Sequence, residues 1–222
     1  MKVGVFDSGV GGLAMVRAIE KEFPDLEIVS VNDRAHVPYG NKTPEELLGL
    51  VVPILEGLVT QGCAVIVIAC NTVTTTIISR LREVIPVPLV GMEPMVKPAA
   101  ERTKSGVIAV CATPATLASA RYAWLKQTYA SEIHVLEPDC SQWALMIEHS
   151  QINEVAIEAE ITAVCDQGAD VIVLGCTHYH WIERTIQRMA ADRALVVQPE
   201  MAVLAELKRQ LTLVRNSNTN VA

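Results

Sequence analysis

The chain has 222 residues, of which 50% are hydrophobic, and its formal net charge is −7. This length and composition are typical of a globular protein and exclude a disordered chain. The eighteen basic residues are scattered along the sequence, so we expect no nucleic-acid partner and no membrane surface. The longest apolar runs have the length of strands, and the first residues are those of a predicted strand, so we expect no membrane span and no signal peptide. We therefore expect a soluble cytoplasmic protein.

The first half of the chain alternates predicted strands and helices. We expect strands at residues 3–6, 28–31, 65–68 and 89–91, and helices at 13–22, 44–61 and 73–84. A polar loop, 32–43, follows the second strand. Pro53 should kink the second helix or divide it in two, because proline cannot donate the helical hydrogen bond.

The second half continues the same alternation. We expect strands at 107–110, 134–136, 171–175 and 195–197, with helices from Thr113 to about Tyr129, from Cys140 to Glu148, and at 153–167, 181–191 and 200–213. Residues 216–222 are predicted to be a disordered tail. Alternating strands and helices are typical of α/β proteins with parallel sheets.

One constant offset relates the two halves. The apolar strand that ends in Cys70 reappears as the strand that ends in Cys176, and at the same spacing residues 28–33 correspond to 134–139, and 3–7 to 109–113. We interpret this as two copies of one βα unit. The expected fold is two pseudo-symmetric α/β domains with a site in the cleft between them, one formed by residues 1–92 plus 197–222 and the other by 93–196.

The six cysteines form no CxxC motif and no short regular spacing, so neither a disulfide framework nor a metal site is predicted. A buried cysteine is usually a small apolar residue, which suits Cys63, Cys111 and Cys165. Cys70 and Cys176 differ, since each ends a strand and precedes a helix. Because helix N-termini attract anions, we expect a lowered thiol pKa there. Two such thiols, facing each other, suit removal of a proton from one face of a carbon and delivery to the other.

Polar residues lie close to both cysteines in the sequence. Asp7 ends the first strand, and His178 follows Cys176 by two residues. Either side chain could exchange a proton with a thiol, although Asp7 could instead cap the next helix and His178 could be a loop residue. Asp7 also precedes a G-x-G-x-x-A pattern that is found in dinucleotide-binding turns. A carboxylate beside a pyrophosphate would be repulsive, and a dinucleotide site would leave the paired cysteines unexplained.

Five segments carry a resemblance to a known family, in the same order and over nearly the whole chain. The sequence resembles glutamate racemase at VFDSGVGGL (5–13), VPYGNKT (37–43), ACNT (69–72), CATPAT (111–116) and GCTHYH (175–180). The resemblance implies an isomerase that needs no cofactor and uses two cysteines. It further implies a supply of D-glutamate for peptidoglycan synthesis, and hence a role in cell-wall biogenesis and cell shape. We also expect a homodimer.

The resemblance assigns roles to individual residues. It implies that Cys70 and Cys176 are the catalytic pair and that Asp7, His178 and Glu148 assist them. Glu148 follows from the resemblance alone. The substrate-binding residues that we expect are Asp7, Ser8, Asp33, Pro38, Tyr39, Gly40, Asn71, Thr72, Thr113, Thr116, Thr177 and His178.

The sequence departs from the family pattern in three places. The chain is shorter than is usual in the family, and 198–200 replaces a motif that usually begins with Asp. His180 stands where the family has proline, and we expect it to face solvent. Aspartate racemase, a two-lobed binding protein and a nucleotide-dependent oxidoreductase are the alternatives that we considered.

Overall fold

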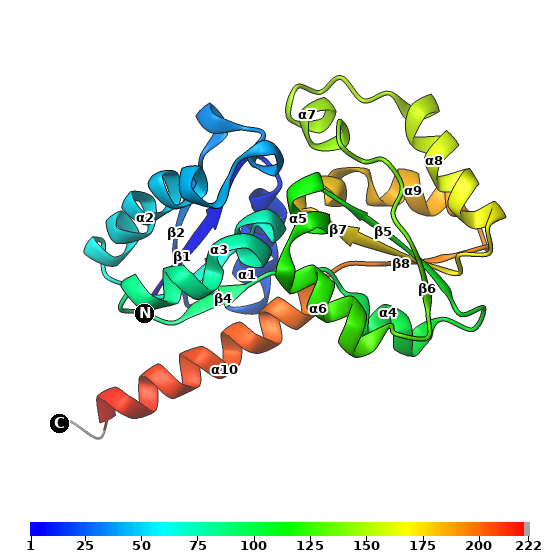
Figure 1. Cartoon of the computed structure of the whole chain (residues 1–222). Coiled ribbons are helices and arrows are strands. Elements are labelled where there is room, and N and C mark those ends of the chain that lie inside the picture. Colours follow the sequence, from blue (N-terminus) through cyan, green and yellow to red (C-terminus); the bar gives the residue numbers. More distant parts are fainter. Residues whose placement is uncertain (220–222) are drawn as a thin grey trace.

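Two parallel sheets, one from each half of the chain, form the two lobes of the computed structural model, which describes residues 1–219 (Figure 1). In spatial order, the first sheet contains β2 (Glu27–Asn32), β1 (Lys2–Asp7), β3 (Cys63–Ile68) and β4 (Leu89–Gly91). The second contains β6 (His134–Leu136), β5 (Val107–Ala112), β7 (Val171–Gly175) and β8 (Leu195–Val197). The two sheets have the same order and direction, which confirms the predicted α/β fold with two related lobes.

Helices cover both faces of the first sheet. Along β3, Ile66 and Ile68 pack on one side against α2 (Pro44–Thr60) and α3 (Asn71–Val84). Val65 and Val67, on the other side, pack against α1 (Gly12–Glu22) and α10 (Glu200–Thr219). Since both faces of the sheet are buried, the sequence of β3 is continuously apolar and does not alternate between apolar and polar residues.

The second sheet is covered in the same way. One face packs against α7 (Trp143–Glu148), α8 (Glu154–Asp166) and α9 (Glu183–Ala190). The other face packs against α4 (Val96–Arg102) and α6 (Ala120–Tyr129), with the short α5 (Pro114–Ala118) at its edge. Figure 1 shows α10 leaving the second lobe and extending along the first.

The described residues also include three short 3₁₀ segments: η1 (Arg34–His36), η2 (Tyr39–Asn41) and η3 (Thr177–Ile182). Within residues 1–219, no helix combines the length and the apolar character needed to cross a membrane. The division of the chain into domains at 92/93 and 196/197 stays a prediction.

Several predicted boundaries are wrong. The helix expected from Thr113 to Tyr129 is broken at Ser119, whose extended backbone ends α5 and whose hydroxyl caps α6. The helix expected from Cys140 begins at Trp143, and η3 occupies the start of the one expected at 181–191. Pro53 does not divide α2. The expected tail is helical up to Thr219, and its last residues, 220–222, lie outside the described part.

Candidate active site

The carboxyl ends of the central strands of both sheets meet at one pocket. Parallel α/β sheets bind ligands at this edge, because loops from neighbouring strands converge there. The lining includes eleven residues that the sequence analysis proposed: Ser8, Pro38, Tyr39, Gly40, Cys70, Asn71, Thr72, Thr113, Cys176, Thr177 and His178. The other four proposed site residues hydrogen-bond to residues that line the pocket: Asp7, Asp33, Thr116 and Glu148.

The two cysteines enter the pocket from opposite lobes. Cys70 immediately precedes α3 in the first lobe, and Cys176 immediately precedes η3 in the second. Both are free thiols and both are almost fully buried. A substrate between them would therefore present one face to each sulfur.

The expected lowering of the thiol pKa values is wrong. Burial, followed by the charge of Asp7, raises the pKa of Cys70 to about 12, although N–H groups at the start of α3 act in the opposite direction. Burial likewise raises the pKa of Cys176 above its usual range. Desolvation of the charged form outweighs the effect of the helix N-termini, so burial favours the protonated form of both thiols.

A chain of polar contacts extends from Cys176 across the lobes. His178 Nδ1 lies 3.9 Å from Cys176 Sγ, and His178 Nε2 lies 2.9 Å from Glu148 Oε2. Arg34 of the first lobe donates from Nε to Glu148 Oε1 at 2.6 Å. Burial alone would raise the pKa of Glu148, but hydrogen bonds from Val10 N–H, Arg34 and His178 hold it below its usual value. A carboxylate on the far nitrogen of a histidine orients the ring and stabilises its charged form.

The surroundings of Cys70 are different. Ser8 Oγ lies 3.5 Å from Cys70 Sγ. The Asp7 carboxylate is fully buried and accepts from Gly12 N–H at 2.6 Å and from the Thr177 hydroxyl at 3.2 Å. Burial raises the pKa of Asp7 above its usual value, while His178 and three backbone N–H groups act to lower it. A carboxyl with a raised pKa is suited to accept a proton at neutral pH.

The glycine turn after β1 fits closely against the second lobe. A Cβ on Gly11 would lie 2.6 Å from His178 N and 2.6 Å from the Thr177 carbonyl carbon, so a larger residue would separate the lobes. The N–H groups of this turn are already used by carboxylates, Gly12 by Asp7 and Val10 by Glu148. A dinucleotide site would direct these groups to a pyrophosphate, so the geometry does not support that alternative.

Hydroxyl groups from both lobes meet on another side of the pocket. Thr72 Oγ1 lies 2.9 Å from Thr113 Oγ1, and Thr113 donates to Thr116 Oγ1 at 3.0 Å. Asn71 is buried at the start of α3, and its side-chain nitrogen and oxygen have no hydrogen-bond partner among residues 1–219. Since buried polar groups are normally paired, Asn71 marks a place for polar atoms of a ligand.

The loop between β2 and α2 forms the pocket wall next to Thr113. Tyr39 OH donates to Asp33 Oδ2 at 2.6 Å, and burial raises the pKa of Tyr39, so the phenol stays neutral. A Cβ on Gly40 would lie 2.8 Å from Thr113 Cβ. Asp33 thus holds Tyr39 in the wall, and Gly40 permits the close approach of the loop.

Comparison with known proteins agrees with this arrangement. A family model described as Asp/Glu/Hydantoin racemase matches residues 3–207. The chain belongs to this family. It is 39% identical to the glutamate racemase of Ectopseudomonas mendocina, over 94% of this chain and 81% of that relative.

Solved structures of the family are similar in fold. The glutamate racemase of Escherichia coli, in complex with L-glutamate and the activator UDP-MurNAc-Ala, has a TM-score of 0.86 and 27% identity, covering 95% of this chain and 82% of that chain. The Francisella tularensis enzyme, in complex with D-glutamate, has a TM-score of 0.80 and 27% identity, covering 96% and 82%. This protein is accordingly an amino-acid racemase, in the isomerase class.

The sequence analysis missed three parts of the racemase site. Arg34 was not singled out, although it directly follows Asp33. The N–H of Val10 carries no side-chain signal, and its contact with Glu148 depends on how the lobes meet. Further residues that were not proposed also line the pocket: Val37, Asn41, Pro114, Ser141 and Ala144.

The expectation for His180 is wrong. The residue is only partly exposed, its buried Nε2 has no hydrogen-bond partner in the described part of the chain, and burial lowers the pKa of His180 to about 4, so the ring is neutral. Within residues 1–219, no group of three or more His, Cys, Asp or Glu side chains is suited to a metal ion.

Proposed function

We propose that this racemase interconverts L- and D-glutamate without a cofactor, with Cys70 and Cys176 as its two bases. The observation that carries the proposal is that one thiol from each lobe lines the same pocket. In the direction from L- to D-glutamate, for which the resemblance to the family assigns Cys176 as the base, the Cys176 thiolate removes the Cα proton and the Cys70 thiol protonates the resulting carbanion on the opposite face. The reverse direction exchanges these roles, so the reaction needs no oxidant and no other reactant.

The polar partners of the cysteines account for how the thiols become bases. Burial raises the pKa of both thiols, so one of them must lose its proton before it can act as a base. The α-ammonium group of a bound amino acid brings a positive charge that favours a neighbouring thiolate. His178 takes the proton of Cys176 and is stabilised by Glu148 at 2.9 Å. Asp7, whose pKa is raised, exchanges a proton with Cys70.

The lining of the pocket accounts for the recognition of a dicarboxylic amino acid. Among the described residues that line the pocket, none is Lys or Arg. Carboxylates are held by the N-terminus of α3, the side chain of Asn71 and the hydroxyls of Ser8, Thr72 and Thr113. The similarity to proteins named glutamate racemase supports glutamate as the substrate.

Aspartate is the second candidate substrate, because it carries the same charged groups on a shorter chain. In the cell, the product D-glutamate would enter peptidoglycan synthesis, in the cytoplasm, with the enzyme acting as a homodimer. Residues 1–92 plus 197–222 and residues 93–196 would form the two domains that open and close around the substrate.

Incorporation of solvent deuterium at Cα tests the proposal. Each enantiomer of glutamate and of aspartate is incubated with the protein in D₂O, and exchange is followed by proton NMR while circular dichroism follows racemisation. We expect glutamate to be racemised faster than aspartate, and Cys70→Ser and Cys176→Ser to abolish net racemisation. Cys165→Ala, in α8 outside the pocket, is the control and should stay active. Faster turnover of aspartate would overturn the substrate, and full activity of either serine variant would overturn the mechanism.

A further inference from the structure

Trp181 joins the two lobes at the rim of the site. Trp181 is 46% exposed as a residue, yet its polar atom is directed at the protein. Nε1 donates to the carbonyl oxygen of Val10 at 3.1 Å, and the guanidinium of Arg17 lies 5.7 Å from the ring centroid. Val10 and Arg17 belong to the first lobe, and Trp181 to the second. A tryptophan N–H that finds its partner on another lobe fixes the position of that partner.

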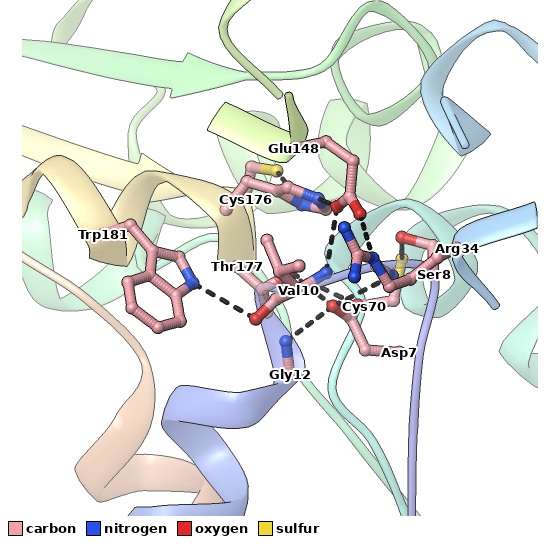
Figure 2. Close-up of polar contacts among 12 residues, drawn as sticks. Asp7, Ser8, Val10, Gly12, Arg34, Cys70, Glu148, Cys176, Thr177 and Trp181 are labelled. Atoms are coloured by element: carbon pink, nitrogen blue, oxygen red, sulfur yellow. Dashed lines mark hydrogen bonds and ion pairs between the residues drawn. The ribbon is translucent and has the colours of Figure 1, made fainter. Parts of the chain in front are cut away.

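Val10 is held by the second lobe through both of its polar backbone groups. Its carbonyl accepts from Trp181, and its N–H donates to Glu148 Oε2 at 3.0 Å (Figure 2). The next residue, Gly11, lies against the backbone of Thr177 and His178. The turn therefore cannot shift without changing its contacts with Glu148 and with the segment that follows Cys176.

The same Glu148 oxygen accepts from Val10 N–H and from His178 Nε2, and His178 Nδ1 lies 3.9 Å from Cys176 Sγ. We propose that Trp181 is a positioning residue, which holds the Val10 turn against Glu148 and thereby aligns His178 for proton exchange with Cys176. The kinetic part of this inference rests on the proposed function, since it takes Cys176 as the base for one enantiomer.

The effect of Trp181 should differ between the two proton transfers. The contacts just described lead to Cys176, whereas Cys70 has Ser8 as its neighbour at 3.5 Å. Because enantiomers have equal free energies, kcat/KM must fall equally in both directions. The loss of Trp181 must therefore change which of the two proton transfers limits the rate. The Cα-deuterium isotope effect, measured in each direction, reports this change.

Trp181→Phe tests the inference, because it removes the N–H and keeps an aromatic ring, although a smaller one. From L-glutamate, the enantiomer that we assign to Cys176, we expect kcat to fall about threefold to tenfold, the factor that corresponds to one neutral hydrogen bond. The isotope effect should rise with deuterated L-glutamate and fall with deuterated D-glutamate. Arg17→Met, which keeps the N–H contact, should retain the balance of the two isotope effects.

Trp124→Phe is the matched control for the loss of an exposed tryptophan. Trp124 is 43% exposed and has its own arginine, with the guanidinium of Arg121 4.3 Å from its ring centroid, in a helix outside the pocket. Trp124→Phe should show the kcat and the isotope effects of the wild type in both directions of racemisation.

A second measurement needs no substrate. Iodoacetamide alkylation of Cys176, followed by mass spectrometry of the peptides, should be faster in Trp181→Phe than in the wild type, because the loosened Val10 turn uncovers the segment after Cys176. If the wild type did not racemise glutamate, the proposed function would fail while this measurement would still report on Trp181. Equal changes in the two isotope effects, the same kinetic change in Trp124→Phe, or unchanged alkylation of Cys176 would each overturn the inference.

Discussion

Replacing Glu148 with glutamine should slow proton transfer through His178 more than it changes stability. The substitution keeps the shape of the side chain and removes the charge that accepts from His178, Arg34 and Val10. Hydrogen bonds to a charged group contribute about 1.5–3 kcal/mol, compared with about 1 kcal/mol for neutral ones. A loss of about 1–2 kcal/mol at the charged histidine corresponds to a fall of about fivefold to thirtyfold in kcat.

The assay for Glu148→Gln follows racemisation in both directions by circular dichroism, with the Cα-deuterium isotope effect measured for each enantiomer. The isotope effect should increase for the enantiomer whose proton Cys176 removes. Glu154→Gln is the matched control, because Glu154 pairs with Arg188 at 3.0 Å on the surface of α8, and an exposed pair contributes about 0–1 kcal/mol. A change of less than twofold in kcat for Glu148→Gln, with the fold intact, would refute the role given to Glu148.

Three further predictions concern stability, lobe contact and cofactors. Burial raises the pKa of Cys70 and Cys176 in the folded protein above the value near 8.5 that a cysteine has in the unfolded chain. The contribution of the two thiols to the free energy of unfolding is therefore complete below about pH 8.5, and it is lost as the pH rises toward the folded pKa. Urea unfolding between pH 8.5 and 10 should therefore show falling stability, and each serine variant should reduce the slope by up to about 1.4 kcal/mol per pH unit; an unchanged slope would contradict burial as the cause. Gly11→Ala should raise KM for both enantiomers at least tenfold, because its Cβ would lie 2.6 Å from His178 N, and wild-type kinetics would show that the lobes need not approach so closely. Dialysis against EDTA should leave the activity unchanged, and restoration of lost activity by a divalent ion would contradict the absence of a cofactor.

The sequence predicted the fold well because the signals that define it are local or repeated. Buried parallel strands are continuous apolar runs, and the repeat around Cys70 and Cys176 indicated two related lobes. Boundaries were less accurate where a side chain decided them, as at Ser119, whose hydroxyl caps a new helix inside an expected one. The error for the thiols had a different cause, since the sequence shows a helix N-terminus but not how completely a sulfur is buried.

The contacts between lobes could not be predicted from the residues alone. Glu148 was identified through the family resemblance, and Arg34 and Trp181 were not identified at all. Each of them contacts a residue more than a hundred positions away, and Glu148 and Trp181 both contact the backbone of Val10. Neither periodicity nor a motif reports a backbone group that is brought into place by the packing of two lobes.

The central claim, that each cysteine serves one face of the substrate, is tested most directly by a half-reaction. The probe is a glutamate with a leaving group on Cβ, which eliminates once the Cα proton has been removed and so needs one base. Cys70→Ser should still process the L-form and Cys176→Ser the D-form, because serine is too weak a base at neutral pH to replace a thiolate. Equal loss for both forms in both variants, with folding intact by circular dichroism, would contradict the two-base account.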